Sequence, residues 1–461
     1  MLIPKSVVNQ SYEEHVNPQW VRLLDVLQMN VRYERCQGVE LQAEDGRCYL
    51  DFLSGYCVHN AGHNHPGIVQ AVKDELDRQG PGMLQSHVAE LAGELAERLC
   101  YLAAGRGECR NLEKVFFCSS GSEGVEAAIK FARARTRRAG IVSAGGAFHG
   151  LTCGALSLMD DPFWRDGFGR LLEDVSIVPF GDLSALEALL QSKSQAAFIV
   201  EPIQSEAGIR MPPTGYLEGA QALCRKYGSL FVLDEVQTGL FRTGPFLAAH
   251  QFGPESGGLE PDMVILAKAL SGGLVPCGAV LMTDAVYGAV YGSLKRSLVH
   301  TSTFGENNLA MRAGLATLDV LEREQLGRRA HQAGKYLRDE LRMSLHGYEM
   351  IHEIRGAGLL NGIEFGAPRK LRLRIPFESF GAIHPAMFGQ LVVMRMFQDH
   401  HILTQICGNN FMVLKAAPPL VVEEEQIDRF VDSVTAVAEL MHTSASFWTD
   451  ALGLARRVVN I

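Results

Sequence analysis

The spacing of the hydrophobic positions alternates along the middle of the chain. Between about residues 66 and 325, short apolar runs such as "AAFIVEPI" and "LFVLDEV" are separated by longer stretches with helical spacing, such as "EGVEAAIKFARARTRR" and "YLEGAQALCRKYG". Continuous apolar runs are typical of strands that are buried on both faces, whereas helical spacing places apolar residues along one side of a helix. The alternation therefore predicts an α/β fold with a large, mainly parallel sheet covered by helices.

The pattern changes in the last third of the chain. A helix-like stretch, "RRAHQAGKYLRDELRMSLH", is followed by two strand-like runs, "EIRGAGLLNGIEF" and "FMVLKAAPPLVV". We interpret 330–461 as a smaller α+β domain, which the N-terminal segment 1–55 joins, and 56–329 as the large domain.

Composition narrows the classes of protein. The chain has 461 residues, of which 47% are hydrophobic and 21% charged, as in ordinary globular proteins. Its formal charge of -9 argues against nucleic acid as a partner. No apolar run reaches the roughly 18 residues of a membrane span, and the N-terminus lacks the apolar core of a signal peptide. Its ten scattered cysteines form no CxxC pair, so reduced thiols and a cytoplasmic location are expected.

The stretch "YCVHNAGHNHP" offers one candidate metal site. Cys57, His59, His63 and His65 lie close together in sequence, but their spacing is irregular for a zinc site. We interpret the stretch as a loop that ends at Pro66, the first-turn proline of a helix. A zinc-dependent hydrolase built on these residues remains the alternative from a different class of enzyme.

Three other features fit one cofactor. Asp234 ends the buried run "FVLD", where an ionised carboxylate needs a cationic partner. Gly121 and Ser122 begin a helix after a strand, where backbone N–H groups can hold an anion. Lys268 follows the apolar run "VILA", and a partly desolvated lysine forms Schiff bases with aldehydes. Together these groups predict a site for pyridoxal phosphate, with Asp234 on the pyridinium nitrogen and Lys268 as both imine-forming and proton-transferring group.

The chain resembles the class III (subgroup II, ω-type) aminotransferases of pyridoxal-phosphate fold type I. The motifs that carry the resemblance occur in order from about residue 45 to 425; they include "GHNHP", "SSGSEGVEAAIKFAR", "GAFHGLT", "EPIQSEAGI", "LDEVQTG", "FRTG", "PDMVILAKALSGG", "HTSTFGENNLA", "RGAGLLNGIEF" and "APPL". Among these enzymes it is most similar to the putrescine, ornithine and acetylornithine aminotransferases. The resemblance implies a large sheet domain, a smaller domain and bound pyridoxal 5'-phosphate.

The resemblance also implies roles at matching positions. Phe148 would stack on the cofactor ring, Val236 would pack on its other face, and Gln237 would bind near the ring hydroxyl. His149 would belong to the same cofactor site. Thr303 would reach the phosphate of the neighbouring subunit, which implies a homodimer with shared active sites. Glu201 and Arg242 are expected to support the site rather than to take part in the chemistry.

Departures from the family pattern concern the substrate. Leu151 stands where relatives that act on amino acids have an arginine after "HG", and Lys415 replaces an arginine before "PPL". Lysine provides charge without the bidentate fork that suits a carboxylate. Glu206 matches a glutamate that can pair with that cation and swing aside, and Tyr56 is a further candidate substrate contact. Leu151 favours a substrate whose reacting end is a plain primary amine or aldehyde.

These features predict an aminotransferase that works by two half-reactions, with glutamate or a primary amine as donor and an aldehyde or ketone as acceptor. An aminomutase or racemase of the same fold is the alternative within this chemistry. One segment, 366–390, matches no family motif; we interpret it as an exposed strand or loop. The alternative hypothesis is that it borders an extended hydrophobic acceptor, such as a lipid, terpenoid or polyketide aldehyde, near a membrane surface.

Overall fold

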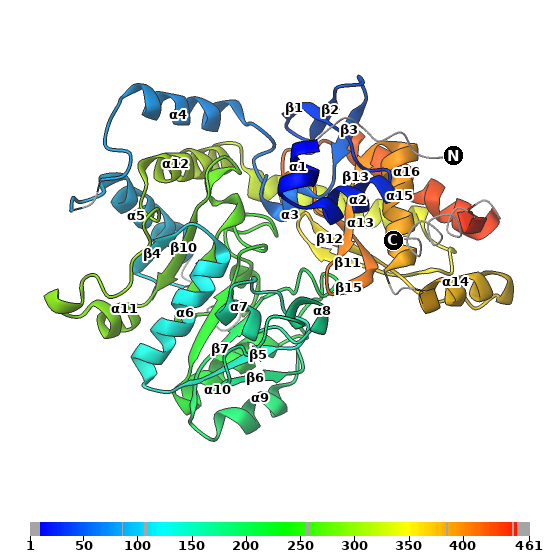
Figure 1. The fold of residues 1–461 in the computed structure, drawn as a ribbon. Coiled ribbons are helices and arrows are strands. Elements are labelled where there is room, and N and C mark those ends of the chain that lie inside the picture. Colours follow the sequence, from blue (N-terminus) through cyan, green and yellow to red (C-terminus); the bar gives the residue numbers. More distant parts are fainter. Residues whose placement is uncertain are drawn as a thin grey trace.

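The computed structural model describes residues 10–84, 86–105, 109–253, 258–383, 386–444 and 447–449. In this part of the chain, three β-sheets are covered by helices (Figure 1). None of the helices there has the length and apolar character that crossing a bilayer requires.

The largest sheet has seven strands in the order β4-β10-β9-β8-β7-β5-β6. The bounds of these strands are β4 Lys114–Cys118, β5 Gly140–Ala144, β6 Val175–Val178, β7 Gln195–Val200, β8 Leu230–Asp234, β9 Met263–Leu266 and β10 Gly278–Met282. Neighbouring strands from β9 to β6 are parallel, and only β10 runs antiparallel to both of its neighbours. The prediction of a mainly parallel sheet is confirmed.

The strands of this sheet are apolar because both of its faces are buried. In β7, Phe198 packs into one hydrophobic cluster and Ile199 into another, as alternating side chains of a strand must. The same alternation separates Phe231 from Val232 in β8. Fully burying one such side chain stabilises the fold by roughly 1.5–3 kcal/mol. This explains why "AAFIV" and "LFVLD" read as continuous apolar runs.

Helices cover the sheet on both faces. The helix α6 (Gly121–Thr136) packs across β4, β7, β8, β9 and β10, whereas α10 (Tyr216–Tyr227) contacts β8 and α9. The other helical elements of this region are α3 Ser54–Cys57, α4 Pro66–Asp77, α5 Glu90–Ala104, α7 Cys153–Ser157, α8 Pro162–Arg165, α9 Leu183–Leu190, η1 Ala248–Gln251, η3 Lys268–Ser271, α11 Asp284–Tyr291, η4 Leu294–Arg296 and α12 Asn308–Arg323.

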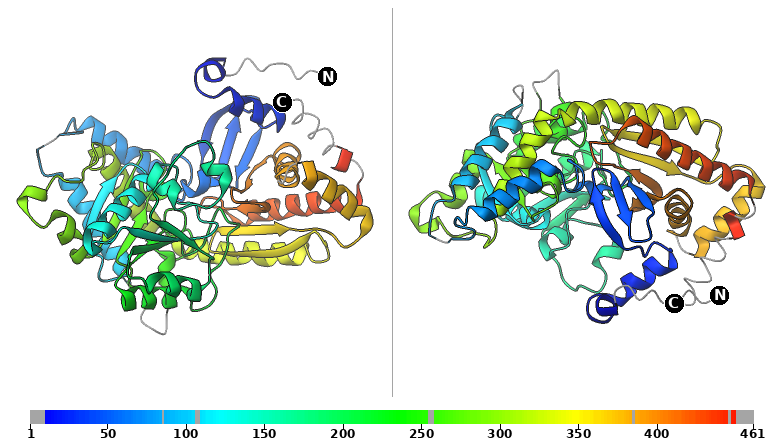
Figure 2. Two further views of the ribbon diagram at one scale, coloured as in Figure 1. Left: turned by 60° about the horizontal axis from the view of Figure 1, so that its bottom comes forward. Right: turned by 90° about the horizontal axis from the view of Figure 1, so that it is seen from above.

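Two four-stranded sheets occupy the other end of the molecule. One, in the order β1-β2-β3-β13, joins the N-terminal strands to a strand from the end of the chain, since β13 pairs in parallel with β3. The other has the order β11-β12-β15-β14. The bounds are β1 Tyr33–Gln37, β2 Glu40–Ala43, β3 Cys48–Asp51, β11 Ile351–Ala357, β12 Leu360–Phe365, β13 Ile402–Leu403, β14 Gln405–Cys407 and β15 Asn410–Ala416. The pairing of β3 with β13 agrees with the expectation that the N-terminal segment joins the smaller domain (Figure 2); the exact domain boundaries stay predictions.

The remaining helices lie around these two sheets and include one that the sequence pattern did not predict. They are α1 Gln10–His15, α2 Pro18–Val26, α13 Leu326–Ser344, α14 Leu371–Ile383, α15 Met387–His400 and α16 Glu424–Thr443. The prediction of a strand or loop at 366–390 is wrong over α14 and the start of α15. In α14, Leu373 is buried while Arg374 bonds Glu378 one helical turn away, so helical contacts outweigh the Pro376 inside the helix. Residues 384–385 and most of the C-terminal tail lie outside the described residues.

Candidate active site

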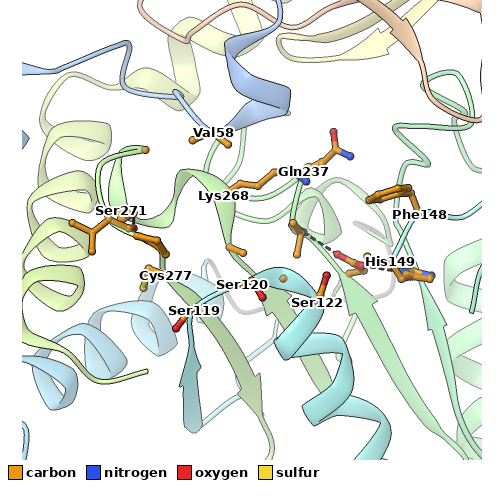
Figure 3. Close-up of a pocket in the computed structure, with 18 of the residues that line it drawn as sticks. Val58, Ser119, Ser120, Ser122, Phe148, His149, Gln237, Lys268, Ser271 and Cys277 are labelled. Atoms are coloured by element: carbon orange, nitrogen blue, oxygen red, sulfur yellow. Dashed lines mark hydrogen bonds and ion pairs between the residues drawn. The ribbon is translucent and has the colours of Figure 1, made fainter. Parts of the chain in front are cut away.

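A cavity of about 490 Å³ opens at the carboxyl ends of the central parallel strands (Figure 3). The loops that follow strands β4, β5, β8 and β9 all contribute to its walls. Ligand sites of parallel α/β sheets are found at this edge. The structure therefore brings together Gly121, Phe148, Asp234 and Lys268, which are far apart in sequence.

Asp234 is the last residue of β8 and is buried in the cavity wall. One carboxylate oxygen lies 2.7 Å from Nδ1 of His149, and the other accepts a hydrogen bond from the backbone N–H of Val236 at 3.1 Å. Burial lowers the pKa of His149, but the hydrogen bond and charge of Asp234 outweigh this and raise it overall. The sequence offered no local partner for Asp234; the structure supplies His149, whose Nε2 is buried and has no partner among the described residues.

Lys268 begins the short helix η3, two residues after the end of β9. It adopts the left-handed backbone conformation, with φ +47°, which is costly for a residue with a side chain. Its amine lines the cavity and has no hydrogen-bond or ion-pair partner in the part of the chain that the structure describes. Burial lowers the pKa of Lys268, so that its neutral, nucleophilic form is more accessible than in water.

The N-terminus of α6 forms the floor of the cavity. The helix begins at Gly121, and Ser120 caps it by accepting a hydrogen bond from the N–H of Glu123 at 3.2 Å; the sequence had placed this start near Ser122. The first N–H groups of a helix have no partner within it and, with the helix dipole, favour an anion. Gly150 is also required here, because a Cβ at this position would come within 2.1 Å of Oγ of Ser122.

Phe148, Val236 and Gln237 line the same cavity, together with Glu201. Glu201 accepts hydrogen bonds from the backbone N–H groups of Phe148, at 3.0 Å, and Ser205, at 3.2 Å. Burial raises the pKa of Glu201 to about 7. The Glu201 carboxyl therefore fixes the backbone that carries Phe148, which agrees with the supporting role expected for it.

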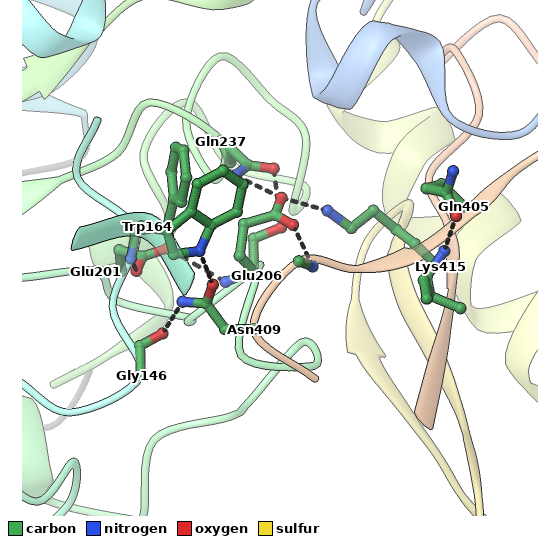
Figure 4. Close-up of polar contacts among 12 residues, drawn as sticks. Gly146, Trp164, Glu201, Glu206, Gln237, Gln405, Asn409 and Lys415 are labelled. Atoms are coloured by element: carbon green, nitrogen blue, oxygen red, sulfur yellow. Dashed lines mark hydrogen bonds and ion pairs between the residues drawn. The ribbon is translucent and has the colours of Figure 1, made fainter. Parts of the chain in front are cut away.

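The four candidate substrate residues lie outside the residues that line this cavity. Glu206 and Lys415 form a buried ion pair with 2.5 Å between Oε1 and Nζ (Figure 4). Burial opposes both charges, but each residue stabilises the other, so the pKa of Glu206 is lowered and that of Lys415 is raised. Nζ of Lys415 lies 5.0 Å from the ring centre of Tyr56, and Leu151 is 53% exposed.

Gln237 connects the ion pair to the cavity. Its side-chain amide donates a hydrogen bond to Glu206 at 3.0 Å, and its carbonyl accepts one from Oγ of Ser205 at 2.9 Å. Because Gln237 also lines the cavity, any movement of Glu206 changes a hydrogen bond at the cavity wall.

Tyr56 sits in a strained backbone segment. The four residues of α3, from Ser54 to Cys57, all have positive φ between 47° and 69°, which makes one turn of left-handed helix. Each non-glycine residue in this conformation costs roughly 1–2 kcal/mol. Arg242 is fully buried and holds the turn, donating hydrogen bonds to Oγ of Ser54 at 3.1 Å and to Oδ1 of Asn60 at 2.6 Å.

Thr303 lies apart from the Lys268 cavity. It is exposed and lines a separate hollow, whose other lining residues include Leu84, His87, Phe116 and Leu298. Within one chain the structure therefore does not bring Thr303 to the other candidate cofactor residues.

The histidines of the candidate metal site have other partners. His63 bonds Asp51 at 2.7 Å, and His65 bonds Glu324 at 3.1 Å while capping α4 through its other ring nitrogen. His59 stacks on His63 with 3.9 Å between ring centres. Within the described ranges, no group of three or more His, Cys, Asp or Glu residues is arranged to hold a metal ion.

Sequence reasoning missed two residues beside the site, Trp164 and Asn409. Nε1 of Trp164 donates a hydrogen bond to Oδ1 of Asn409 at 2.8 Å (Figure 4). Asn409 lies in the hairpin turn before β15, and 245 residues separate it from Trp164. The only sequence signal was "GNN", which indicates a turn and no more.

The residues of the cavity fit pyridoxal phosphate. An amine without a partner, a buried carboxylate and the open N–H groups of a helix N-terminus are the three groups that this cofactor requires. The tight packing of Gly150 on Ser122 also leaves the approach to the helix N-terminus free of side-chain bulk.

Comparison with known proteins gives a consistent result. The family model for class-III aminotransferases matches residues 24–437. The curated relatives include "Aminotransferase PigE" from a Serratia species, 36% identical over 94% of this chain and 53% of that protein, and a putrescine aminotransferase from Pectobacterium atrosepticum, 37% identical over 86% of this chain and 80% of that protein. The chain thus spans about half the length of PigE.

Solved structures with the same fold include two aminotransferases. An ornithine aminotransferase from Toxoplasma gondii has a TM-score of 0.77, 30% identity and coverage of 90% of this chain and 91% of that one. An acetylornithine aminotransferase from Elizabethkingia anophelis has a TM-score of 0.69, 29% identity and coverage of 91% and 98%. The chain belongs to the class-III aminotransferases, a family of pyridoxal-phosphate-dependent transaminases with the mixed α/β architecture of fold type I.

Proposed function

We propose that the protein is a transaminase that moves an amino group from an amino donor to an aldehyde or ketone in two half-reactions. One observation carries this proposal: the amine of Lys268, which has no partner among the described residues, and the buried carboxylate of Asp234 share a cavity with the N-terminus of α6. A metal-dependent or purely structural protein has no need of that combination.

Each group of the cavity has a role toward the cofactor. Gly121 and Ser122 would hold its phosphate, Lys268 its aldehyde and Asp234 its ring nitrogen. When bound, pyridoxal phosphate supplies an electron-withdrawing ring that stabilises negative charge on the substrate's α-carbon. His149 would orient the Asp234 carboxylate toward the ring nitrogen, because its Nδ1 lies 2.7 Å from one carboxylate oxygen and can donate a hydrogen bond to it.

Lys268 would also transfer the substrate proton. Its amine lies in the cavity and burial lowers its pKa, so the neutral form that accepts a proton is more accessible than in water, and the amine can return the proton at another atom. Phe148 and Val236, which line the cavity, would restrict the ring plane, and Gln237 would bind at the ring hydroxyl. These roles follow from position and from the family pattern.

For the amino donor we propose glutamate or a primary amine such as putrescine. The putrescine aminotransferase from Pectobacterium supports the second, since it is 37% identical over 86% of this chain. The exposed Leu151 in place of a carboxylate-binding arginine also favours a donor without a carboxylate near the reacting carbon. Lys415 can receive a carboxylate only after Glu206 releases it, which makes glutamate the more demanding substrate.

The first experiment is a visible absorption spectrum of the purified protein with added glutamate, ornithine, putrescine or a long-chain amine. We expect a cofactor band that one class of donor removes, with keto or aldehyde product equal to the protein concentration. Stoichiometric product also separates a transaminase from an aminomutase or racemase. If no band appears even after addition of pyridoxal phosphate, the proposal is wrong.

We further propose a homodimer in which Thr303 serves the cofactor site of the other subunit. Two large apolar side chains that line the hollow around Thr303, Leu84 and Leu298, are 60% and 80% exposed. Val88, Leu294 and Phe304, which are close to these residues in sequence, are exposed as well. Such patches mark association surfaces. Mixing inactive Lys268→Ala with inactive Thr303→Glu tests this, because a heterodimer keeps one intact site. About a quarter of native activity should return if subunits mix at random; no recovery in a mixture shown to contain heterodimers contradicts the shared site.

The acceptor is the least constrained part of the proposed function. We propose a diamine-derived or extended hydrophobic aldehyde, and α14 is the candidate contact for the latter. This helix exposes Leu371 and Ile375, at 71% and 59%, beside Arg372 and Arg374. Replacing both arginines by serine should lower turnover of long-chain acceptors and leave short ones unchanged. Equal turnover of long acceptors by native and variant enzymes removes α14 from the proposal.

The cysteines bear on the proposed location. None of the ten, all of which lie in the described part of the chain, forms a disulfide, and six are buried. Chains without disulfides are typical of reducing compartments. This supports the predicted cytoplasmic location, which cell fractionation would test.

A further inference from the structure

Trp164 contacts two parts of the site, Phe148 at the cofactor cavity and the hairpin turn beside Glu206. It belongs to the short helix α8, and its ring packs edge-on against Phe148 with 5.3 Å between ring centres and an interplanar angle of 76°. Phe163 packs edge-on against Trp164 from a second direction, at 4.8 Å. Edge-to-face pairs of this kind hold aromatic rings in place beyond the effect of burial alone. The ring of Phe148 is therefore positioned by Trp164.

Asn409 fixes the other edge of the indole. Besides accepting from Trp164, its side-chain amide donates to the backbone carbonyls of Gly146, at 3.0 Å, and Ala147, at 3.2 Å. Its backbone N–H donates to the carbonyl of Glu206 at 2.9 Å. The hairpin turn before β15 is thus bonded at once to the loop that carries Phe148 and to the residue that pairs with Lys415.

Gly408 completes the contact between the indole and the ion pair. Its N–H donates to Oε2 of Glu206 at 2.9 Å. A Cβ on Gly408 would lie 3.2 Å from that oxygen and 3.4 Å from Cζ2 of Trp164. The indole and the Glu206 carboxylate therefore flank the same residue, and a side chain there would be tightly packed against the carboxylate. Figure 4 shows Trp164, Asn409 and Glu206 together.

We propose that Trp164 is a specificity-determining residue, which the Trp164–Asn409 hydrogen bond holds as a wall between Phe148 and the Glu206–Lys415 pair. This inference rests on the proposed transaminase function. A rigid aromatic wall limits the width of the group that a substrate can place beside Phe148. Without the indole, wider amines and carbonyl compounds fit, while narrow substrates lose only contact area. Discrimination by pocket size of this kind is worth about tenfold or more in relative kcat/KM.

The first test compares two amino donors, putrescine and 4-phenylbutylamine, in native enzyme and three variants. Trp164→Ala should raise the ratio of kcat/KM for 4-phenylbutylamine to that for putrescine by about tenfold or more. Trp164→Phe keeps an aromatic ring and should shift the ratio less, and Asn409→Ala, which frees the indole, should shift it in the same direction. A merely structural role lowers both values together, so an unchanged ratio in Trp164→Ala and Asn409→Ala overturns the proposal.

The second test needs no turnover and decides the matter if Trp164→Ala does not fold. The chain has three tryptophans, so the fluorescence of native protein minus that of Trp164→Phe isolates Trp164. Asn409→Ala should move this emission to longer wavelength, because the indole loses its hydrogen bond and gains water. If the emission of Trp164 is unchanged in Asn409→Ala, the hydrogen bond does not hold the indole and the proposal is wrong. Failure of the transaminase proposal looks different, since the native enzyme would then process neither amine.

Discussion

The cofactor cavity and the Glu206–Lys415 pair lie on either side of Gln237, yet the chain builds them in different ways. The cavity uses residues at the ends of consecutive strands of one sheet: Asp234 ends β8, and Lys268 follows β9, which lies beside it. The ion pair joins residues 209 positions apart, Glu206 from the loop after β7 and Lys415 from β15. The sheet geometry itself creates the first site, whereas the second exists only when both ends of the molecule meet.

The difference separates the proposed chemical groups from the residues that we propose select the substrate. The cavity can carry out proton transfer with groups that are already fixed by the sheet. The second region contains a salt bridge, a hairpin turn and an indole, each from a different element, so small changes in packing alter it without touching Lys268 or Asp234. Substitutions on the two sides should therefore have different signatures.

The largest effect is expected from Lys268→Ala, because this removes both the aldehyde-binding amine and the proton-transferring group. We expect activity to fall by about 10³-fold or more with the fold intact. Lys73→Ala, at an exposed position on α4, is the matched control and should retain native activity. Initial rates of product formation provide the measurement. Activity above a tenth of native in Lys268→Ala would falsify the assignment.

The second prediction concerns the stability of the ion pair. Glu206→Gln leaves Lys415 buried without a partner, and such a charge costs about 3–5 kcal/mol. The double variant Glu206→Gln with Lys415→Met should cost clearly less, since it removes both charges. The exposed pair Arg170–Glu173 supplies the control: Glu173→Gln should change the free energy of unfolding by less than about 0.5 kcal/mol. Urea unfolding measures the free energy of unfolding of all three variants. Equal costs for Glu206→Gln and Glu173→Gln would contradict this prediction.

The pH dependence sharpens this prediction. The pKa of Glu206 is lowered in the folded state, so its ionisation stabilises the fold above the ordinary value of 4.5 and this contribution is lost as pH falls through the folded value. The stability difference between native protein and the double variant should change as the pH drops below 4.5. A difference that stays constant over that range would show that the pair is not formed in solution.

The contribution of Glu201 to stability should change with pH in the opposite direction to that of Glu206. Its folded pKa of about 7 lies above the ordinary 4.5, so the folded state holds an extra proton between these values and loses stability as pH rises through them. Glu201→Gln removes this loss and should gain on the native protein by up to about 3 kcal/mol between pH 4.5 and 8. Thermal melts at several pH values measure it. A constant difference across the range would mean that Glu201 titrates normally.

The smallest effect is expected at the helix cap. Ser120→Ala removes the N-cap of α6 and should cost about 1 kcal/mol of stability, as should Thr283→Ala at the N-cap of α11. Since backbone groups of Gly121 and Ser122 are the proposed phosphate ligands, affinity for pyridoxal phosphate should change little in either variant. Equilibrium titration with the cofactor checks this. A loss confined to Ser120→Ala would make that hydroxyl a phosphate ligand.

How far the sequence predicted the site depends on how local each feature is. The parallel sheet and the meeting of Asp234, Lys268 and Gly121 at one edge follow from apolar runs and strand ends, and were predicted. The bond from His149 to Asp234 was not, because it joins loops 85 residues apart. Trp164 and Asn409 likewise gave no local signal.

The error at 366–390 has a different cause. The alternation of basic and apolar residues up to Ile375 resembles the period of a strand, and Pro376 argues against a helix interior. The packing of α14 against α15 and the contact of Arg374 with Glu378 favour the helix instead. Tertiary contacts thus overrode a local pattern only a few residues long.

The left-handed turn at Ser54–Cys57 bears on the order in which the protein assembles. Such a turn is unfavourable in an isolated chain, and its supports are distant: Oγ of Ser54 donates to the carbonyl of Ala417, 363 residues away. Closing so long a loop is slow and entropically costly. Tyr56 can therefore reach Lys415 only late in folding, after the last strands have docked. The cofactor residues at the sheet edge do not depend on this late contact, whereas the surface that we propose for substrate selection does.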